Sequence, residues 1–142
     1  MKKIPLLLFL YFSSTIVQSE PIDDLGILAT DYVNACHATY YLKMTYCKKI
    51  IIQKTTNCLR HSVSLMPKER QKHLLETIRN NLAKFNSETQ LDIDKAFTES
   101  LIKNNNDRIQ SCESISQTLT SQRDDRYYEF RNKLKEIYPK RR

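Results

Sequence analysis

The residues with the most definite chemistry in this sequence are its four cysteines, Cys36, Cys47, Cys58 and Cys112. Cysteines serve as nucleophiles, zinc ligands or disulfide partners, and their spacing helps to separate these roles. No Cys-x-x-Cys pair and no His-x-x-x-His pair occurs, so the sequence does not predict a zinc site. An even number of cysteines in a short exported chain is typical of a disulfide framework. We therefore expect two disulfides, for which three connectivities exist.

The spacing of the first three cysteines restricts how they can pair. They lie eleven residues apart each time, close to three helical turns, so one continuous helix would place them on a single face. Along that helix they would be roughly 16 Å apart, whereas a disulfide needs Cα atoms about 4.4–6.8 Å apart. Because Cys112 can pair with only one of them, two bridges require the chain to fold back between Cys36 and Cys58.

The position of this fold-back would determine the pairing. A turn near residues 40–45 would suit one bridge between the first and second cysteines and another between the third and fourth. A turn near residues 55–57 would suit the second with the third and the first with the fourth. Thr55, Thr56 and Asn57 have the better turn chemistry, which favours the second arrangement.

Histidines and carboxylates do not form a catalytic constellation along the chain. His37, His61 and His73 have no cysteine or serine partner at a spacing that local structure would bring together. A cysteine–histidine nucleophile would also need a reduced thiol, which an oxidising compartment disfavours. Asp92 and Asp94 would point to different faces of a helix, so they do not suggest acid–base catalysis.

Glycine content excludes several classes of enzyme. Gly26 is the only glycine in the chain. Gly-rich phosphate loops, the dinucleotide-binding fingerprint and the Gly-x-Ser-x-Gly nucleophile elbow each need several glycines. The sequence therefore predicts a protein that is not an enzyme and has no cofactor and no metal.

The N-terminal residues have the three parts of a secretory signal peptide. The first three residues include two lysines, residues 4–12 are almost entirely apolar, and small polar residues follow up to Ser19. A transmembrane anchor is the alternative, but a span needs about 20 apolar residues and this run is interrupted at Ser13. We predict a signal peptide over residues 1–19, cleaved before Glu20, and a protein secreted to the extracellular space or the periplasm.

Basic charge is concentrated in two blocks. The formal net charge of +7 falls to +5 once Lys2 and Lys3 leave with the signal peptide. No acidic residue occurs between Asp31 and Glu69, and residues 123–142 hold a second excess of lysine and arginine. Such blocks suit an acidic partner or an anionic membrane surface, although a solvated helical face is the simpler interpretation. The candidate basic contact surface comprises Lys43, Lys48, Lys49, Lys54, Arg126, Arg131, Lys133 and Lys135.

Apolar residues at helical spacing predict the first helix. Asp23 and Asp24 are its expected caps, and helical spacing continues from Leu25 as far as Cys58. The β-branched run over residues 50–52 would suit a strand, but it is too short and isolated to form a sheet.

Three further helices are predicted from their start and stop signals. Pro67 suits the first turn of the next helix. Ser87, with a glutamine three residues later, forms a capping box that predicts the start of another. The polar residues 104–106 should end it, and Asp107 should cap a long last helix. We expect an all-α, disulfide-stapled bundle of four to five helices in a single domain over residues 20–138, with a basic tail over residues 139–142.

The order of three evenly spaced cysteines, then Pro67 heading a helix, then Cys112 about 45 residues later resembles the periplasmic immunity proteins that neutralise cell-wall amidases. The resemblance covers residues 25–112 and implies a small exported helical protein that inhibits an amidase delivered by a neighbouring cell. Lys48-Lys49-Ile50 stands where a Gly-Tyr-type motif is expected after the second cysteine, and the basic last helix lies outside the pattern. No site residue is carried over from this resemblance.

These observations together predict a non-enzymatic binding protein that presents a helical face to a protein partner, as an inhibitor or immunity protein would. A helical carrier of a small apolar ligand is one alternative. A secreted signalling or toxin-like protein whose basic last helix contacts a membrane or receptor is another. Nucleic acid is not an expected partner, because tyrosines on helices of a small secreted domain usually lie at the edge of a core or in an interface.

Overall fold

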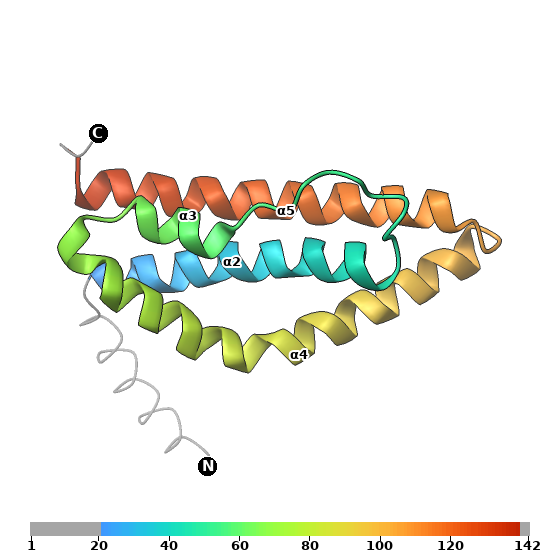
Figure 1. The fold of residues 1–142 in the computed structure, drawn as a ribbon, viewed down its shortest axis with the longest axis horizontal. Coiled ribbons are helices and arrows are strands. Elements are labelled where there is room, and N and C mark those ends of the chain that lie inside the picture. The colour runs from blue at the N-terminus through green and yellow to red at the C-terminus, as the bar shows by residue number, and fades with distance from the viewer. Residues whose placement is uncertain (1–20, 140–142) are drawn as a thin grey trace, which may run out of the picture.

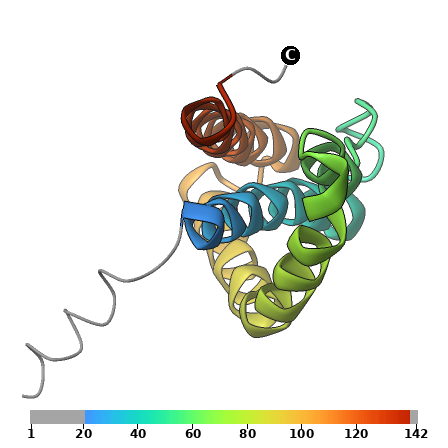
Figure 2. The ribbon, with the colours of Figure 1, turned by 90° about the vertical axis from the view of Figure 1, so that its left-hand side faces the viewer.

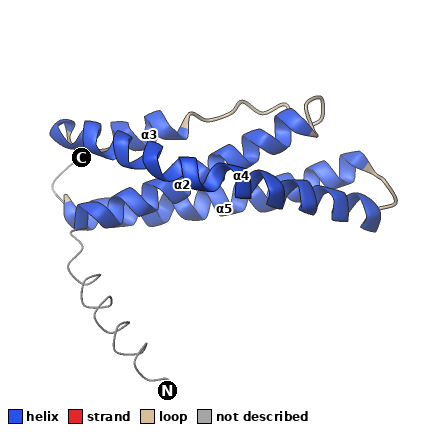
Figure 3. Cartoon of the chain, turned by 90° about the horizontal axis from the view of Figure 1, so that it is seen from below, coloured by secondary structure: helices blue, strands red, loops and turns tan. Residues whose placement is uncertain are grey.

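The computed structural model describes residues 21–139, and this part of the chain is entirely helix and loop (Figure 1, Figure 3). The predicted all-α fold is confirmed. The predicted signal peptide and residues 140–142 of the predicted basic tail lie outside the described residues. The elements in chain order are α2 (Pro21–Thr45), α3 (Cys58–Ser64), the 3₁₀ helix η1 (Lys68–Arg70), α4 (Gln71–Lys103) and α5 (Arg108–Ile137).

Helix α2 lies at the centre of the bundle. It runs antiparallel to α5 on one side and packs against α4 on the other, while α3 covers a third side near the start of α4 (Figure 1, Figure 2). Leu25, Ala29, Val33 and Leu42 of α2 are completely or almost completely buried. A helix with neighbours on several sides can bury more than one stripe, which is why α2 supplies side chains to both parts of the core.

The core consists of two apolar clusters. The first joins α2 to α3, the start of α4 and the end of α5, and includes Phe130, Met66 and Ile78. The second joins the end of α2 to the end of α4 and the start of α5, and includes Leu42 and Phe97. The two clusters therefore stabilise opposite ends of the bundle.

Polar contacts connect α2 to the middle of α4. Thr89 Oγ1 donates a hydrogen bond to Asn34 Oδ1 at 3.1 Å, and His37 Nδ1 lies 3.4 Å from Asn86 Oδ1. Figure 1 shows that α4 bends in this middle portion and that its two halves approach α2 toward opposite ends. A polar junction between two apolar clusters is consistent with this bend.

The predicted break before Ser87 is wrong, because α4 is one continuous helix of 33 residues. Leu82 and Ile93, on either side of Ser87, are both buried and lie eleven residues apart. Eleven residues are close to three turns, so both side chains occupy one face of an unbroken helix packed on α2. Tertiary packing of this face outweighs the local capping signal.

The two ends of α2 also differ from the prediction. The helix begins at Pro21, so the aspartates predicted to cap it lie within the helix and not before it. It ends at Thr45 and does not continue to Cys58. The chain turns over residues 46–50, and Asn57 caps α3 by accepting a hydrogen bond from the Arg60 amide.

Two disulfides form, as predicted, but their pairing is different from either arrangement favoured above. Cys36 pairs with Cys58, with Cα atoms 6.3 Å apart, and this is called the α2–α3 bridge. Cys47 pairs with Cys112, with Cα atoms 5.9 Å apart, and this is called the loop–α5 bridge. The fold-back is not a tight turn, because twelve residues leave the end of α2, reach α5 and return to the middle of α2. That excursion separates Cys47 from Cys58.

The predicted cap at Asp107 is confirmed, whereas Pro67 lies just before the first helical turn and not within it. Pro67 precedes η1, which leads directly into α4. Asp107 caps α5 by accepting a hydrogen bond from the Gln110 amide at 3.0 Å. Between α4 and α5, Asn105 and Asn106 have φ values of 56° and 64°, a left-handed conformation that asparagine tolerates better than most residues.

Candidate contact surface

The segment 46–57 is fastened to the bundle by a disulfide near each end, and we call it the stapled loop. Cys47 attaches its start to α5, and Cys58, directly after its end, attaches to Cys36 in the middle of α2. The loop forms the arch between α2 and α3 in Figure 1, and Figure 3 shows that it contains no regular secondary structure. A loop closed at both ends loses less conformational entropy when it binds a partner.

Aromatic packing fixes the start of the stapled loop. The ring of Tyr46 stacks on Phe97 of α4 with centroids 4.4 Å apart. Arg108 Nε donates a hydrogen bond to the Tyr46 carbonyl oxygen at 2.9 Å, and its guanidinium lies 5.9 Å from the Phe97 ring centroid. The loop is therefore bound to α4 and α5 by contacts additional to the disulfide.

Two tyrosine hydroxyls share one carboxylate beside this position. Tyr41 and Tyr46 donate hydrogen bonds to Asp94 Oδ1 at 2.7 Å and 2.6 Å. The bond to Asp94 raises the pKa of Tyr46 to about 12 and also raises the pKa of Tyr41. The same two bonds lower the pKa of Asp94. Asp94 is thus held ionised as an acceptor between two neutral phenols.

The outer side of the stapled loop combines an apolar side chain with positive charge. Ile52 is 80% exposed, and Lys48, Lys49 and Lys54 around it are exposed as well. Lys43 of α2 reaches the loop and donates a hydrogen bond to the Gln53 carbonyl oxygen at 2.6 Å. An exposed aliphatic residue surrounded by cations suits a contact with a surface that is partly apolar and partly acidic.

The structure separates the predicted basic surface into two groups. Lys43, Lys48, Lys49 and Lys54 lie on the stapled loop and the end of α2. Arg126, Arg131, Lys133 and Lys135 lie on α5, which runs antiparallel to α2 (Figure 1), and the last three of them follow Arg126 toward the end of that helix. Lys43 and Lys54 of the first group line a hollow together with Arg123, and Arg131 lies eight residues farther along α5, roughly 12 Å at 1.5 Å per residue.

Acidic neighbours partly neutralise the group on α5. Arg126 Nη1 lies 3.2 Å from Glu129 Oε1, and Lys133 Nζ lies 3.3 Å from Glu136 Oε1. No ion pair involves a lysine of the stapled loop within the described residues. The first group is therefore the stronger candidate for contact with an acidic partner.

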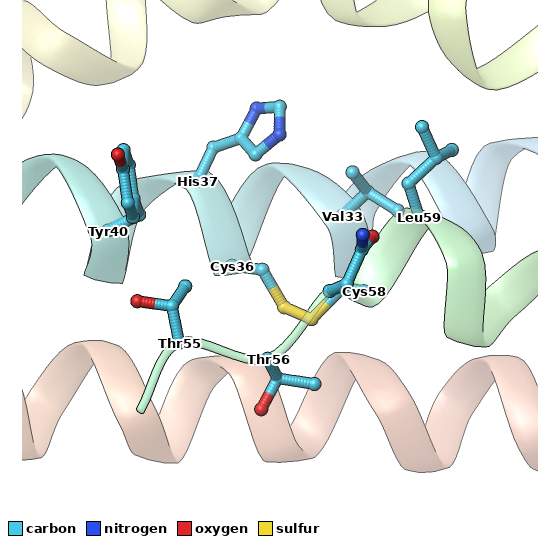
Figure 4. A pocket seen from close by; sticks show the side chains of 9 residues that line it. Val33, Cys36, His37, Tyr40, Thr55, Thr56, Cys58 and Leu59 are labelled. Carbon is cyan, nitrogen blue, oxygen red and sulfur yellow. A yellow bond between two sulfur atoms is a disulfide. The ribbon is translucent and has the colours of Figure 1, made fainter. Parts of the chain in front are cut away.

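A hollow of about 390 Å³ lies beside the α2–α3 bridge (Figure 4). Its lining includes Val33, His37 and Tyr40 of α2, together with Thr55 and Thr56 of the stapled loop. Cys36 and Cys58 form its floor, and Figure 4 shows their disulfide between the loop and α2. The lining contains no carboxylate or second histidine that would suggest acid–base chemistry.

His61 takes part in an aromatic cluster between α2, α3 and α5. Its Nδ1 lies 3.1 Å from the Tyr32 hydroxyl, and its ring stacks on Tyr127 with centroids 5.4 Å apart. Burial raises the pKa of Tyr32. This cluster accounts for His61 and Tyr127 as packing groups, consistent with tyrosines at the edge of a core.

Over residues 21–139, no group of three or more histidine, cysteine, aspartate or glutamate side chains could hold a metal ion. All four cysteines are paired. In the same part of the chain, no helix combines the length and hydropathy needed to cross a bilayer.

The sequence prediction identified the lysines of the stapled loop but not the loop itself. Helical spacing through Cys58 suggested a continuing helix and concealed it. The turn chemistry at residues 55–57 was a usable signal, because Asn57 is the cap of α3. Comparison with protein-family models, curated proteins and solved structures finds no match to this chain.

Proposed function

We propose that this protein is an exported, non-enzymatic binding protein whose stapled loop docks on an acidic surface of a protein partner. One observation supports this most strongly: two disulfides hold an exposed isoleucine and several unpaired lysines in one fixed loop. Exposed apolar side chains and desolvated charges contribute most to binding when their conformation is set in advance. Two disulfides are also consistent with an oxidising, secreted or periplasmic environment.

The acidic partner is favoured by the charge distribution around the loop. The chain has no acidic residue between Asp31 and Glu69, a stretch that includes the whole stapled loop. The end of α5 has acidic residues interspersed with its basic ones, such as Glu129 and Glu136. A contact made by the basic last helix therefore has less electrostatic support than a contact made by the loop. An inhibitor or immunity protein is one form that such a binder could take.

Site-specific photo-crosslinking tests this proposal. A photoreactive amino acid replaces Ile52 in one variant and Leu91 or Ile102 in two controls, since these α4 residues are also highly exposed aliphatics. After irradiation in the native extracytoplasmic fraction, we expect one discrete protein adduct from position 52 and none from the controls. Adducts at the α4 positions with none at position 52 would contradict the proposal.

A charge-reversal pair tests the electrostatic part of the proposal. Lys48→Glu with Lys49→Glu should abolish the adduct at position 52, because both side chains are exposed beside it. Arg131→Glu with Lys135→Glu changes net charge by the same amount at the other end of the bundle and should leave the adduct intact. Equal loss in both double variants would show that net charge, and not the loop, determines binding.

A further inference from the structure

A second hollow, of about 240 Å³, lies on the side of the stapled loop that faces α5, and we call it the basic crevice. Its walls come from three elements: the end of α2, the loop, and the middle of α5. The α2–α3 bridge joins the first two, and the loop–α5 bridge joins the loop to the third. Covalent links therefore fix the relative positions of all three walls.

Each wall of the basic crevice contributes a positively charged side chain. Lys43 comes from α2, Lys54 from the loop and Arg123 from α5, and no carboxylate belongs to the lining. Lys54 makes no ion pair or hydrogen bond within residues 21–139. Arg123 Nη2 is 3.4 Å from Asp124 Oδ1, a carboxylate that is 57% exposed and does not belong to the lining. The three cations are therefore incompletely compensated by the protein.

Hydroxyl groups complete the polar lining. Thr55 and Thr56 from the loop face Ser116 and Thr120 from α5 across the crevice. None of these four hydroxyls has a hydrogen-bond partner in the described part of the chain, whereas the neighbouring Thr118 is already bonded to the Ser114 carbonyl oxygen. Cations together with available hydroxyl donors are the groups that bind phosphate and sulfate oxygens.

We propose that the basic crevice binds a tetrahedral oxyanion, phosphate or sulfate, either free or as the terminal group of an ester. The hollow is several times the volume that one water occupies in the liquid, about 30 Å³, so an anion fits with part of an ester substituent. This site shares Lys43 and Lys54 with the contact surface proposed above, but Ile52, Lys48 and Lys49 do not belong to its lining. Lys54 and Arg123 supply the charge-assisted bonds, because Lys43 is partly engaged by the Gln53 carbonyl oxygen.

Nuclear magnetic resonance titration of the purified, oxidised protein tests this proposal. Inorganic phosphate, sulfate and phosphoserine are added separately, with sodium chloride at matched ionic strength as the reference. We expect saturable shifts of the amides of Thr55, Thr56 and Thr120 with the oxyanions and not with chloride. Tighter binding of phosphoserine than of inorganic phosphate would identify an ester as the better ligand, whereas equal binding would identify a free-anion site.

Matched variants test whether the amide shifts arise from binding in the basic crevice. Lys54→Gln and Arg123→Gln should each weaken oxyanion binding by about tenfold, which corresponds to about 1.4 kcal/mol. Lys48→Gln removes the same charge outside the lining and should change binding by less than twofold. Thermal unfolding of each variant confirms that it is folded. Equal effects from all three variants, or oxyanion shifts that match those of chloride, would overturn the proposal.

Discussion

A close contact between α2 and α4 allows one prediction to be worked out quantitatively. Gly26, the only glycine in the chain, is buried in α2 against Thr77 of α4. A Cβ atom at position 26 would lie 2.8 Å from Thr77 Cγ2 and 3.7 Å from Thr77 Cβ. The first distance is a clash and the second is an ordinary contact. Gly26 is therefore required by the Thr77 methyl group and not by its backbone conformation.

Two opposing effects determine the free energy of unfolding of a Gly26→Ala variant. Alanine in a helix interior is more favourable than glycine by about 1 kcal/mol. Overpacking a close contact costs about 1–3 kcal/mol. We therefore expect Gly26→Ala to lower stability by about 1 kcal/mol in the wild-type background. In a Thr77→Ser background the methyl group is absent, so the same change should raise stability by about 1 kcal/mol.

A double-mutant cycle measured by chemical denaturation tests this expectation. The four proteins are wild type, Gly26→Ala, Thr77→Ser and the double variant, each unfolded in guanidinium chloride and followed by helical circular dichroism. The predicted coupling is about 2 kcal/mol, well above the additivity error of about 0.5 kcal/mol. A coupling within that error, or a stabilising Gly26→Ala in the wild-type background, would refute the inferred contact between α2 and α4.

Three further changes have expected outcomes. Replacing both cysteines of the loop–α5 bridge by alanine should lower the free energy of unfolding by about 4 kcal/mol, whereas replacing both cysteines of the α2–α3 bridge should lower it by about 3 kcal/mol, because the loop–α5 bridge closes the longer loop. Denaturation curves that reverse this order would contradict the pairing. Asp94→Asn should bring the Tyr46 pKa from about 12 toward 10 in a spectrophotometric titration, and an unchanged titration would contradict the hydrogen bond. The same change should remove a contribution to stability that the wild type retains below pH 10 and loses as the pH rises toward 12. Phe130→Ala should lower the free energy of unfolding by about 3–5 kcal/mol, because the Phe130 side chain is fully buried. Tyr128→Ala should lower it by less than about 0.5 kcal/mol, because Tyr128 is 54% exposed, and equal losses would contradict the placement of α5.

Features encoded by local chemistry could be predicted from the sequence. The asparagines before α5 adopt left-handed conformations, and Asp107 caps the helix, because both properties depend on residues within a few positions of one another. The helical spacing of apolar residues in α2, and the start and stop signals of the later helices, predicted an all-helical bundle for the same reason.

Features decided by tertiary packing could not be predicted in this way. Ser87 has a good capping signal, yet the buried Leu82 and Ile93 on the same face keep α4 continuous. The disulfide pairing depends on the path of the stapled loop, which leaves α2 after Thr45 and returns to Cys36. Spacing alone showed that the chain must fold back, but it contained no information on the length of that excursion.

The composition of the candidate site was also only partly predictable. The lysines of the loop were identified by the absence of acidic residues around them. The basic crevice was not identified, because Arg123 and Thr120 lie more than sixty residues from Lys54 in the chain and approach it only through the loop–α5 bridge. Separation of the basic residues into two groups likewise follows from the antiparallel arrangement of α2 and α5.

Disulfide mapping is the most direct test of the central claim, which is that two bridges fasten the stapled loop to α5 and to the middle of α2. Trypsin places each cysteine in a different peptide, because a lysine or arginine lies between every consecutive pair. Mass spectrometry of the unreduced digest should show peptide 44–48 bonded to peptide 109–123, and peptide 55–60 bonded to the peptide that ends at Lys43. Peptide 44–48 bonded to peptide 55–60, or four cysteines that react as free thiols, would contradict the account.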